Sequence, residues 1–92
     1  MYKLEELSPD QLLFTSSRIG FLPGVKRALE RGADVHAQND LALHWASVNG
    51  HKDTVEVLLK ARANAHTQDD WTLRVASEKG HKDVVELLKR YM

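Results

Sequence analysis

Apolar side chains recur along this chain at the three- and four-residue spacing of a helix face. In the middle of the chain they mark two short segments, the first through Leu43, Ala46 and Ser47 and the second through Val55, Leu58 and Leu59. Gly50 separates the two segments and is expected to end the first helix as a left-handed residue. Asp53 is the expected N-cap of the second helix. The pattern therefore predicts a pair of short helices joined by a turn.

The same helix pair occurs three times along the chain. Gly20, Gly50 and Gly80 are spaced 30 residues apart, and residues 41–62 share ten identities with residues 71–92. Helices this short are unstable alone, so each unit is expected to depend on burial against its neighbours. The first copy opens with a capping box between Ser8 and Gln11.

The combined motif is specific and covers about residues 8–92. It consists of Leu43-His44-Trp45-Ala46-Ser47, Gly50-His51 and Val55-Glu56-Val57-Leu58-Leu59, with Leu29-Glu30-Arg31-Gly32-Ala33-Asp34-Val35-His36-Ala37 closing the first unit. These residues resemble the ankyrin repeat. The resemblance implies an all-α solenoid of three helix-turn-helix units, whose antiparallel helix pairs stack side by side and whose loops border a concave face.

We expect one domain over residues 1–92. It divides into a leader at 1–7, an N-terminal capping repeat at 8–40, a middle repeat at 41–70 and a C-terminal capping repeat at 71–92. Ankyrin units are roughly 33 residues long, whereas the period here is 30. The shortfall lies where the family has its β-hairpin finger, and we expect tight turns at Asn39-Asp40 and Asp69-Asp70 in its place. Short repeats of this kind resemble the ankyrin arrays of giant DNA viruses.

Two further departures from the family pattern concern single residues. Arg62 stands where the first unit has Gly32, so a left-handed backbone there would strain the arginine by about 1 kcal/mol. Arg74 replaces the family histidine that His44 retains, and His44 is expected to hydrogen-bond backbone near its own turn.

Composition and charge exclude several classes of function. Thirteen basic residues balance thirteen acidic ones, which argues against nucleic-acid or membrane-surface binding. No cysteine is present, so neither disulfides nor a thiolate nucleophile exist. No apolar run approaches the length of about 18 residues that spans a bilayer. We expect an intracellular protein, cytoplasmic or nuclear.

No constellation in the sequence predicts catalysis, a metal or a cofactor. Equivalent histidines fall in successive units, as with His36 and His66 or His51 and His81, and stacked helices about 8–10 Å apart place such pairs poorly for one zinc ion. Phosphate-binding and nucleophile-elbow motifs are absent from the sequence. We therefore expect no enzyme activity.

Candidate partner-binding residues differ between the copies while the framework repeats. They are Arg18 and Ile19, Val48 and Asn49, and Glu78 and Lys79 at the ends of the first helices, together with Leu41 and Trp71 at their starts. Such variation is typical of a recognition surface and equally of neutral drift. Trp71 either faces a partner as an interface anchor or folds over the core, and Trp45 is expected within the core.

Two classes of function follow from the sequence. The favoured one is a non-enzymatic module that binds a partner protein through its concave first-helix face. The alternative is a structural or self-associating unit, or part of a longer ankyrin array. Lys89 replaces the apolar Leu59 of the preceding unit, which is typical of a polar terminal cap and favours a monomer.

Overall fold

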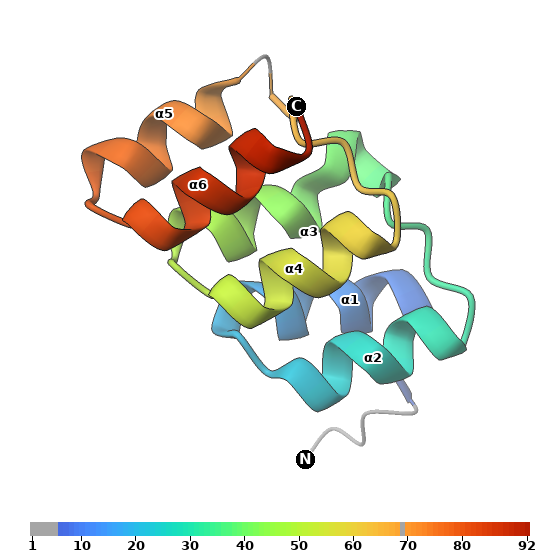
Figure 1. Ribbon diagram of the computed structural model, residues 1–92. Coiled ribbons are helices and arrows are strands. Elements are labelled where there is room, and N and C mark those ends of the chain that lie inside the picture. Colours follow the sequence, from blue (N-terminus) through green and yellow to red (C-terminus); the bar gives the residue numbers. More distant parts are fainter. Residues whose placement is uncertain (1–5, 69) are drawn as a thin grey trace.

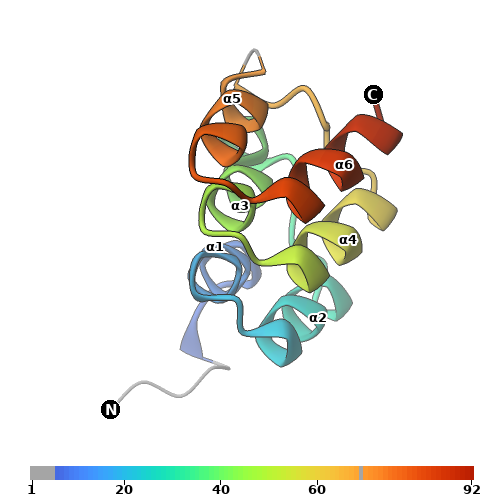
Figure 2. The same cartoon turned by 60° about the vertical axis from the view of Figure 1, so that its left-hand side comes forward.

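Helix pairs repeat three times in the computed structural model, which describes residues 6–68 and 70–92. In these residues the helices are α1 (Pro9–Ile19), α2 (Leu22–Glu30), α3 (Ala37–Val48), α4 (Lys52–Lys60), α5 (Trp71–Glu78) and α6 (Lys82–Arg90), with no strand between them (Figure 1). The first helices of the pairs, α1, α3 and α5, form one layer, and α2, α4 and α6 form a second layer beside it (Figure 2). The prediction of an all-α helical repeat is confirmed.

Both ends of α1 follow from local backbone chemistry. Ser8 and Gln11 form the predicted capping box, in which the Gln11 amide donates to Ser8 Oγ at 3.1 Å and the Ser8 amide donates to Gln11 Oε1 at 3.0 Å. Gly20 ends α1 with a φ of 76°, a conformation that glycine adopts without a Cβ clash. The N-cap predicted at Asp53 is wrong, because α4 begins after His51 and Asp53 lies within its first turn. A carboxylate there still faces the positive end of the helix dipole.

One apolar cluster runs through all three units. Its largest fully buried members are Leu12, Leu13, Val25, Leu43, Val55, Leu58, Val84 and Leu88. Small side chains let the first helices approach closely, and Ala46, Ala76, Ser17 and Ser47 are all fully buried. Each helix pair thus depends on its neighbours for burial.

Histidine side chains pack against the glycine turn of the preceding unit. A Cβ placed on Gly20 would lie 2.5 Å from Nδ1 of His51, and one on Gly50 would lie 2.7 Å from Nδ1 of His81. His51 Nε2 also forms a hydrogen bond of 2.9 Å with the Arg18 carbonyl. Glycine is therefore required at these two turns for close approach as well as for positive φ.

The units are connected by short left-handed turns in place of hairpins. Gln38, Asn39 and Asp40 have φ values of 54°, 57° and 58°, so right-handed helix in α3 starts only after Asp40. The turn predicted at Asn39-Asp40 is confirmed. In the next connection Gln68 and Asp70 are also left-handed, whereas Asp69 lies outside the described residues.

The turn after α4 has the strained backbone that the sequence predicts. Arg62 has a φ of 75°, close to the 88° of its counterpart Gly32. The Arg62 amide donates to the Leu59 carbonyl at 2.9 Å, which closes the end of the helix. A non-glycine residue is thus held in the left-handed region at this position.

Candidate functional site

An aromatic ridge, formed by His44, Trp45 and Trp71, crosses from α3 to α5. The His44 ring lies 5.6 Å from the Trp45 ring and 6.5 Å from the Trp71 ring, edge-on to both. Trp71 is 60% exposed, so it does not fold over the core. Trp45 is 37% exposed, and its predicted place within the core is wrong.

His44 holds the ridge to the last unit. Its Nδ1 forms a hydrogen bond of 2.7 Å with Oγ1 of Thr72, a fully buried residue of α5. The expected bond to nearby backbone is therefore wrong, because the partner is a threonine 28 residues further along the chain. Burial lowers the pKa of His44 below its ordinary value, which favours the neutral imidazole. No feature of the sequence indicated that Thr72 pairs with His44 of the preceding unit.

A hollow adjoins each tryptophan, and each hollow is also lined by an arginine. One hollow, of about 130 Å³, lies between Trp45 and Arg18 and is completed by Phe14 and Thr15 of α1. The second, of about 370 Å³, is lined by Gln68, Asp70, Trp71 and Arg74. Among residues 6–68 and 70–92, no carboxylate lies within 4 Å of either guanidinium. The aromatic ridge is thus bordered by two cationic groups.

The other candidate residues differ in their exposure to solvent. Ile19 is 61% exposed, and Glu78 and Lys79 are exposed at the far end of α5. Leu41 is half-buried at the start of right-handed helix in α3. The expected exposure of Val48 is wrong, because this side chain is only 4% exposed.

Asn49 has a structural contact as well as an exposed side chain. Its Nδ2 donates to the Arg18 carbonyl at 3.1 Å, beside the bond from His51. The two bonds fix the backbone at the end of α1. The Arg18 side chain remains exposed beyond them.

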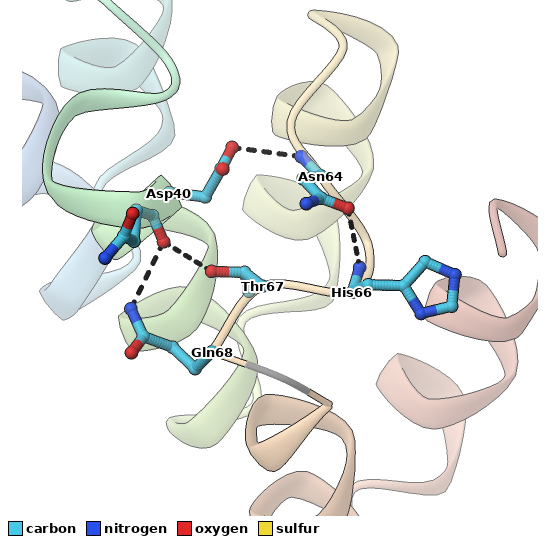
Figure 3. A pocket seen from close by; sticks show the side chains of 6 residues that line it. Asp40, Asn64, His66, Thr67 and Gln68 are labelled. Carbon is cyan, nitrogen blue, oxygen red and sulfur yellow. Dashed lines mark hydrogen bonds between the residues drawn. The ribbon is translucent and has the colours of Figure 1, made fainter.

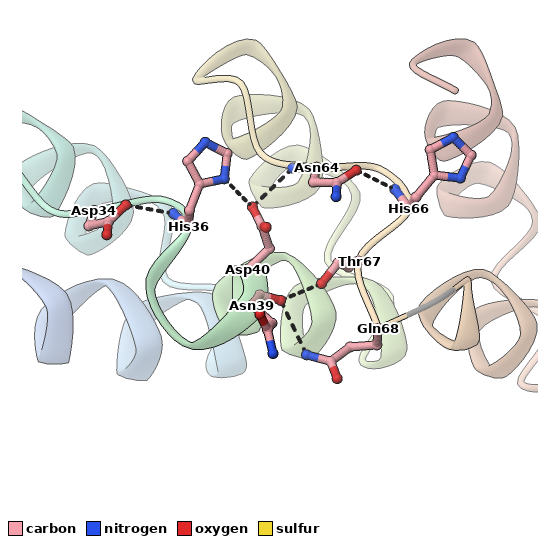
Figure 4. Close-up of polar contacts among 8 residues, drawn as sticks. All are labelled: Asp34, His36, Asn39, Asp40, Asn64, His66, Thr67 and Gln68. Carbon is pink, nitrogen blue, oxygen red and sulfur yellow. Dashed lines mark hydrogen bonds and ion pairs between the residues drawn. The ribbon is translucent and has the colours of Figure 1, made fainter.

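A polar hollow of about 260 Å³ lies between the two connections (Figure 3). One of its lining residues is Asp40, which is only 6% exposed. Asp40 Oδ1 accepts a hydrogen bond of 2.9 Å from the Asn64 amide and pairs with His36 Nδ1 at 2.9 Å. The Asn39 carbonyl accepts from Thr67 Oγ1 and Gln68 Nε2 (Figure 4).

This polar network stabilises the left-handed turn. Asp10, one period earlier than Asp40, accepts from the Asp34 amide at 2.8 Å in the same way. In both cases a carboxylate from the first helix of a pair binds the backbone amide 24 residues later, in the loop after the second helix of the same pair. In the described part of the chain, no group of three or more His, Cys, Asp or Glu side chains is placed to hold a metal ion.

Comparison with protein families agrees with this architecture. The family model for ankyrin repeats matches residues 12–91 in three copies. The chain therefore belongs to the ankyrin repeat family. Ankyrin repeats generally act as protein–protein interaction modules and are typically non-enzymatic. No curated protein and no solved structure was found to match the chain. Among the described residues, no helix has the length and apolar character to cross a membrane.

Proposed function

We propose that the protein binds a partner protein through the aromatic ridge and the exposed ends of α1 and α5. The observation that carries the proposal is that both tryptophans of the chain lie on this ridge and are exposed. Tryptophan is enriched among the few residues that dominate interface energies. Its large ring contributes contact area while few rotamers are lost on binding.

The ridge is held in place before any partner arrives. His44 is fixed by Thr72, and both tryptophan rings contact His44 edge-on. A rigid surface loses little conformational entropy on association, so more of the contact energy contributes to affinity. Ile19 at the end of α1 and the exposed Glu78 and Lys79 at the end of α5 would adjust its specificity.

The test compares Trp71→Ala with Tyr91→Ala. Tyr91 is an exposed aromatic residue that follows α6, in the other layer of helices, and is the matched control. Proteins captured by the wild-type chain from an extract of its native cell should be lost with Trp71→Ala and retained with Tyr91→Ala. Both variants should melt within a few degrees of the wild type. Equal capture by all three chains would contradict the proposal.

A second candidate function, stacking on a further repeat, is favoured by the outer face of the last unit. Gly80 has a φ of 81°, and no atom of the described residues comes within 4 Å of its Cβ position. Ser77 is exposed there, whereas its counterparts Ser17 and Ser47 are fully buried. Lys89 makes the same face more polar, which disfavours stacking.

Light scattering distinguishes the two functions. A stacking chain should show a mass that rises with concentration, and the Val85→Glu variant should abolish the rise because Val85 lies on this face. A mass of one chain at all concentrations would exclude self-association.

A further inference from the structure

The geometry points to the chemistry of the partner: an extended acidic segment that also carries apolar side chains. This inference rests on the proposed function, because it places the segment along the aromatic ridge. It assigns apolar side chains to the hollows beside Trp45 and Trp71. It assigns carboxylates to Arg18 and Arg74.

The two hollows are suited to apolar side chains. Each is open to solvent on one side and has an indole as one wall. An apolar side chain seated against an exposed indole removes apolar surface of both groups from water, worth roughly 25 cal/mol per Å². His44 lies between the two indoles, so an extended segment can contact both without leaving the surface.

The two guanidinium groups are suited to carboxylates. Arg18 and Arg74 line the hollows from different helices, and neither has a carboxylate within 4 Å among residues 6–68 and 70–92. Arginine pairs with carboxylates in a bidentate, charge-assisted geometry. Each arginine can therefore bind an acidic side chain next to the apolar one.

The negative charges near the ridge do not cancel this preference. Asp70 lines the hollow of Trp71, but its Oδ1 forms a hydrogen bond of 2.7 Å with Nδ1 of His66, and its carboxylate lies more than 4 Å from the guanidinium of Arg74. Glu78 lies at the far end of α5 beside the basic Lys79. The remaining positive charge next to the tryptophans is that of the two arginines.

A protein segment fits these observations better than a single-stranded nucleic acid does. Nucleic-acid strands also stack on aromatic side chains, but they require a basic groove that follows many phosphates. Here the whole chain has a net charge of zero, and only two arginines border the ridge. Binding of an oligonucleotide is therefore an outcome that would overturn the inference.

The experiment selects ligands from a phage-displayed library of random dodecapeptides on the intact chain. Such peptides span about 40 Å when extended, enough to follow a molecule whose longest dimension is 35 Å. Binding of synthetic copies of the selected peptides is then measured by the intrinsic tryptophan fluorescence of the protein. Because the chain has two tryptophans and both lie on the ridge, the signal reports on the site itself.

Paired variants test the two parts of the inference separately. The Arg18→Gln, Arg74→Gln double variant removes both charges, while the hydrogen bonds to Arg18 remain because they go to its backbone carbonyl. The control is Lys82→Gln with Arg90→Gln, which removes two exposed charges from α6. Trp71→Ala tests whether the ridge is used at all.

We expect selected peptides rich in Asp or Glu beside apolar residues. Their affinity should fall about tenfold or more with the arginine double variant, fall as salt rises from about 0.05 to 0.3 M, and stay unchanged in the α6 control. Neutral or basic peptides that still need Trp71 would overturn the acidic chemistry and leave the proposed function standing. Peptides whose affinity is unchanged by Trp71→Ala, or a selection that yields no binding peptide, would overturn both the acidic chemistry and the proposed function. Stronger fluorescence quenching by oligothymidine than by any peptide would overturn the assignment to a protein partner.

Discussion

The imidazole of His81 occupies the space that a side chain on Gly50 would need. The Cβ position of Gly50 lies 2.7 Å from both Nδ1 and Cε1 of the ring. The glycine and the histidine are 31 positions apart in the sequence and come from successive units. The first two units show the same pair as Gly20 and His51.

This relationship separates two costs of replacing glycine. Gly50→Ala should lower the free energy of unfolding by about 1 kcal/mol for the left-handed backbone and by roughly 1 kcal/mol or more for displacing the ring. Gly80→Ala should show only the first cost, because nothing occupies its Cβ position. Urea denaturation of both variants measures the difference. In a His81→Ala background the two alanine substitutions should cost the same, and a persisting excess at Gly50 would mean that the ring is not its source.

Arg62→Gly should stabilise the protein. Its φ of 75° strains an arginine but not a glycine. The gain is a few tenths to about 1 kcal/mol, since glycine also loosens the unfolded chain. Gly32→Arg should cost a similar amount, and backbone strain alone would cause it because nothing lies near that Cβ position. Chemical denaturation midpoints check both, and a lower midpoint for Arg62→Gly would show that the arginine side chain makes a stabilising contact.

The partly buried imidazole of His44 makes stability depend on pH. Its folded-state pKa lies below the ordinary 6.5, so the unfolded chain takes up a proton first as the pH falls. The stability that this group contributes is therefore fully present above about pH 6.5, the pKa of the unfolded chain. It should be lost progressively as the pH falls below 6.5 and through the lower pKa of the folded state. His44→Gln keeps a polar partner for Thr72 and does not titrate. Thermal melts at several pH values between about 7.5 and 5 should show a smaller loss for the variant than for the wild type. Parallel losses in both proteins would assign the effect to other groups.

Removal of residues 83–92 should unfold the whole chain. This segment contributes Val84, Leu87 and Leu88 to the single apolar cluster. Two units and one remaining helix bury too little apolar surface to offset chain entropy. Circular dichroism of the fragment should show little helix and no cooperative melting. A cooperative transition would mean that the first two units are stable by themselves.

Features fixed by local backbone chemistry could be predicted from the sequence. The capping box at Ser8, the left-handed Arg62 and the tight turn at Asn39-Asp40 each depend on residues close together in the chain. Because the units repeat, a conformation expected in one unit is also expected at the equivalent position of the next, as with Gly32 and Arg62. The sequence left two alternatives for Trp71, which could be exposed to a partner or fold over the core beside the shortened connection. The sequence alone could not decide between them.

The features that could not be predicted depend on contacts between units. Helix α3 packs against α1, α4 and α5 together, so its buried arc is wider than the single face that its apolar spacing marks. Val48 falls inside this arc, whereas Trp45 falls outside it. The bond between His44 and Thr72 likewise joins two units, and nothing in either local sequence indicates it.

The uncovered Gly80 has a consequence for how the molecule opens. In the part of the chain that the structure describes, the pair α5–α6 packs against a neighbouring unit on one side only. Its amides should therefore exchange with deuterium faster than those of α3–α4, through partial unfolding from that end. Trp71 belongs to this opening pair and Trp45 to the central one. A ligand that contacts both would bind only while the last pair is closed. Such a ligand should slow exchange in α6, which it does not touch, by a factor set by its concentration relative to its Kd.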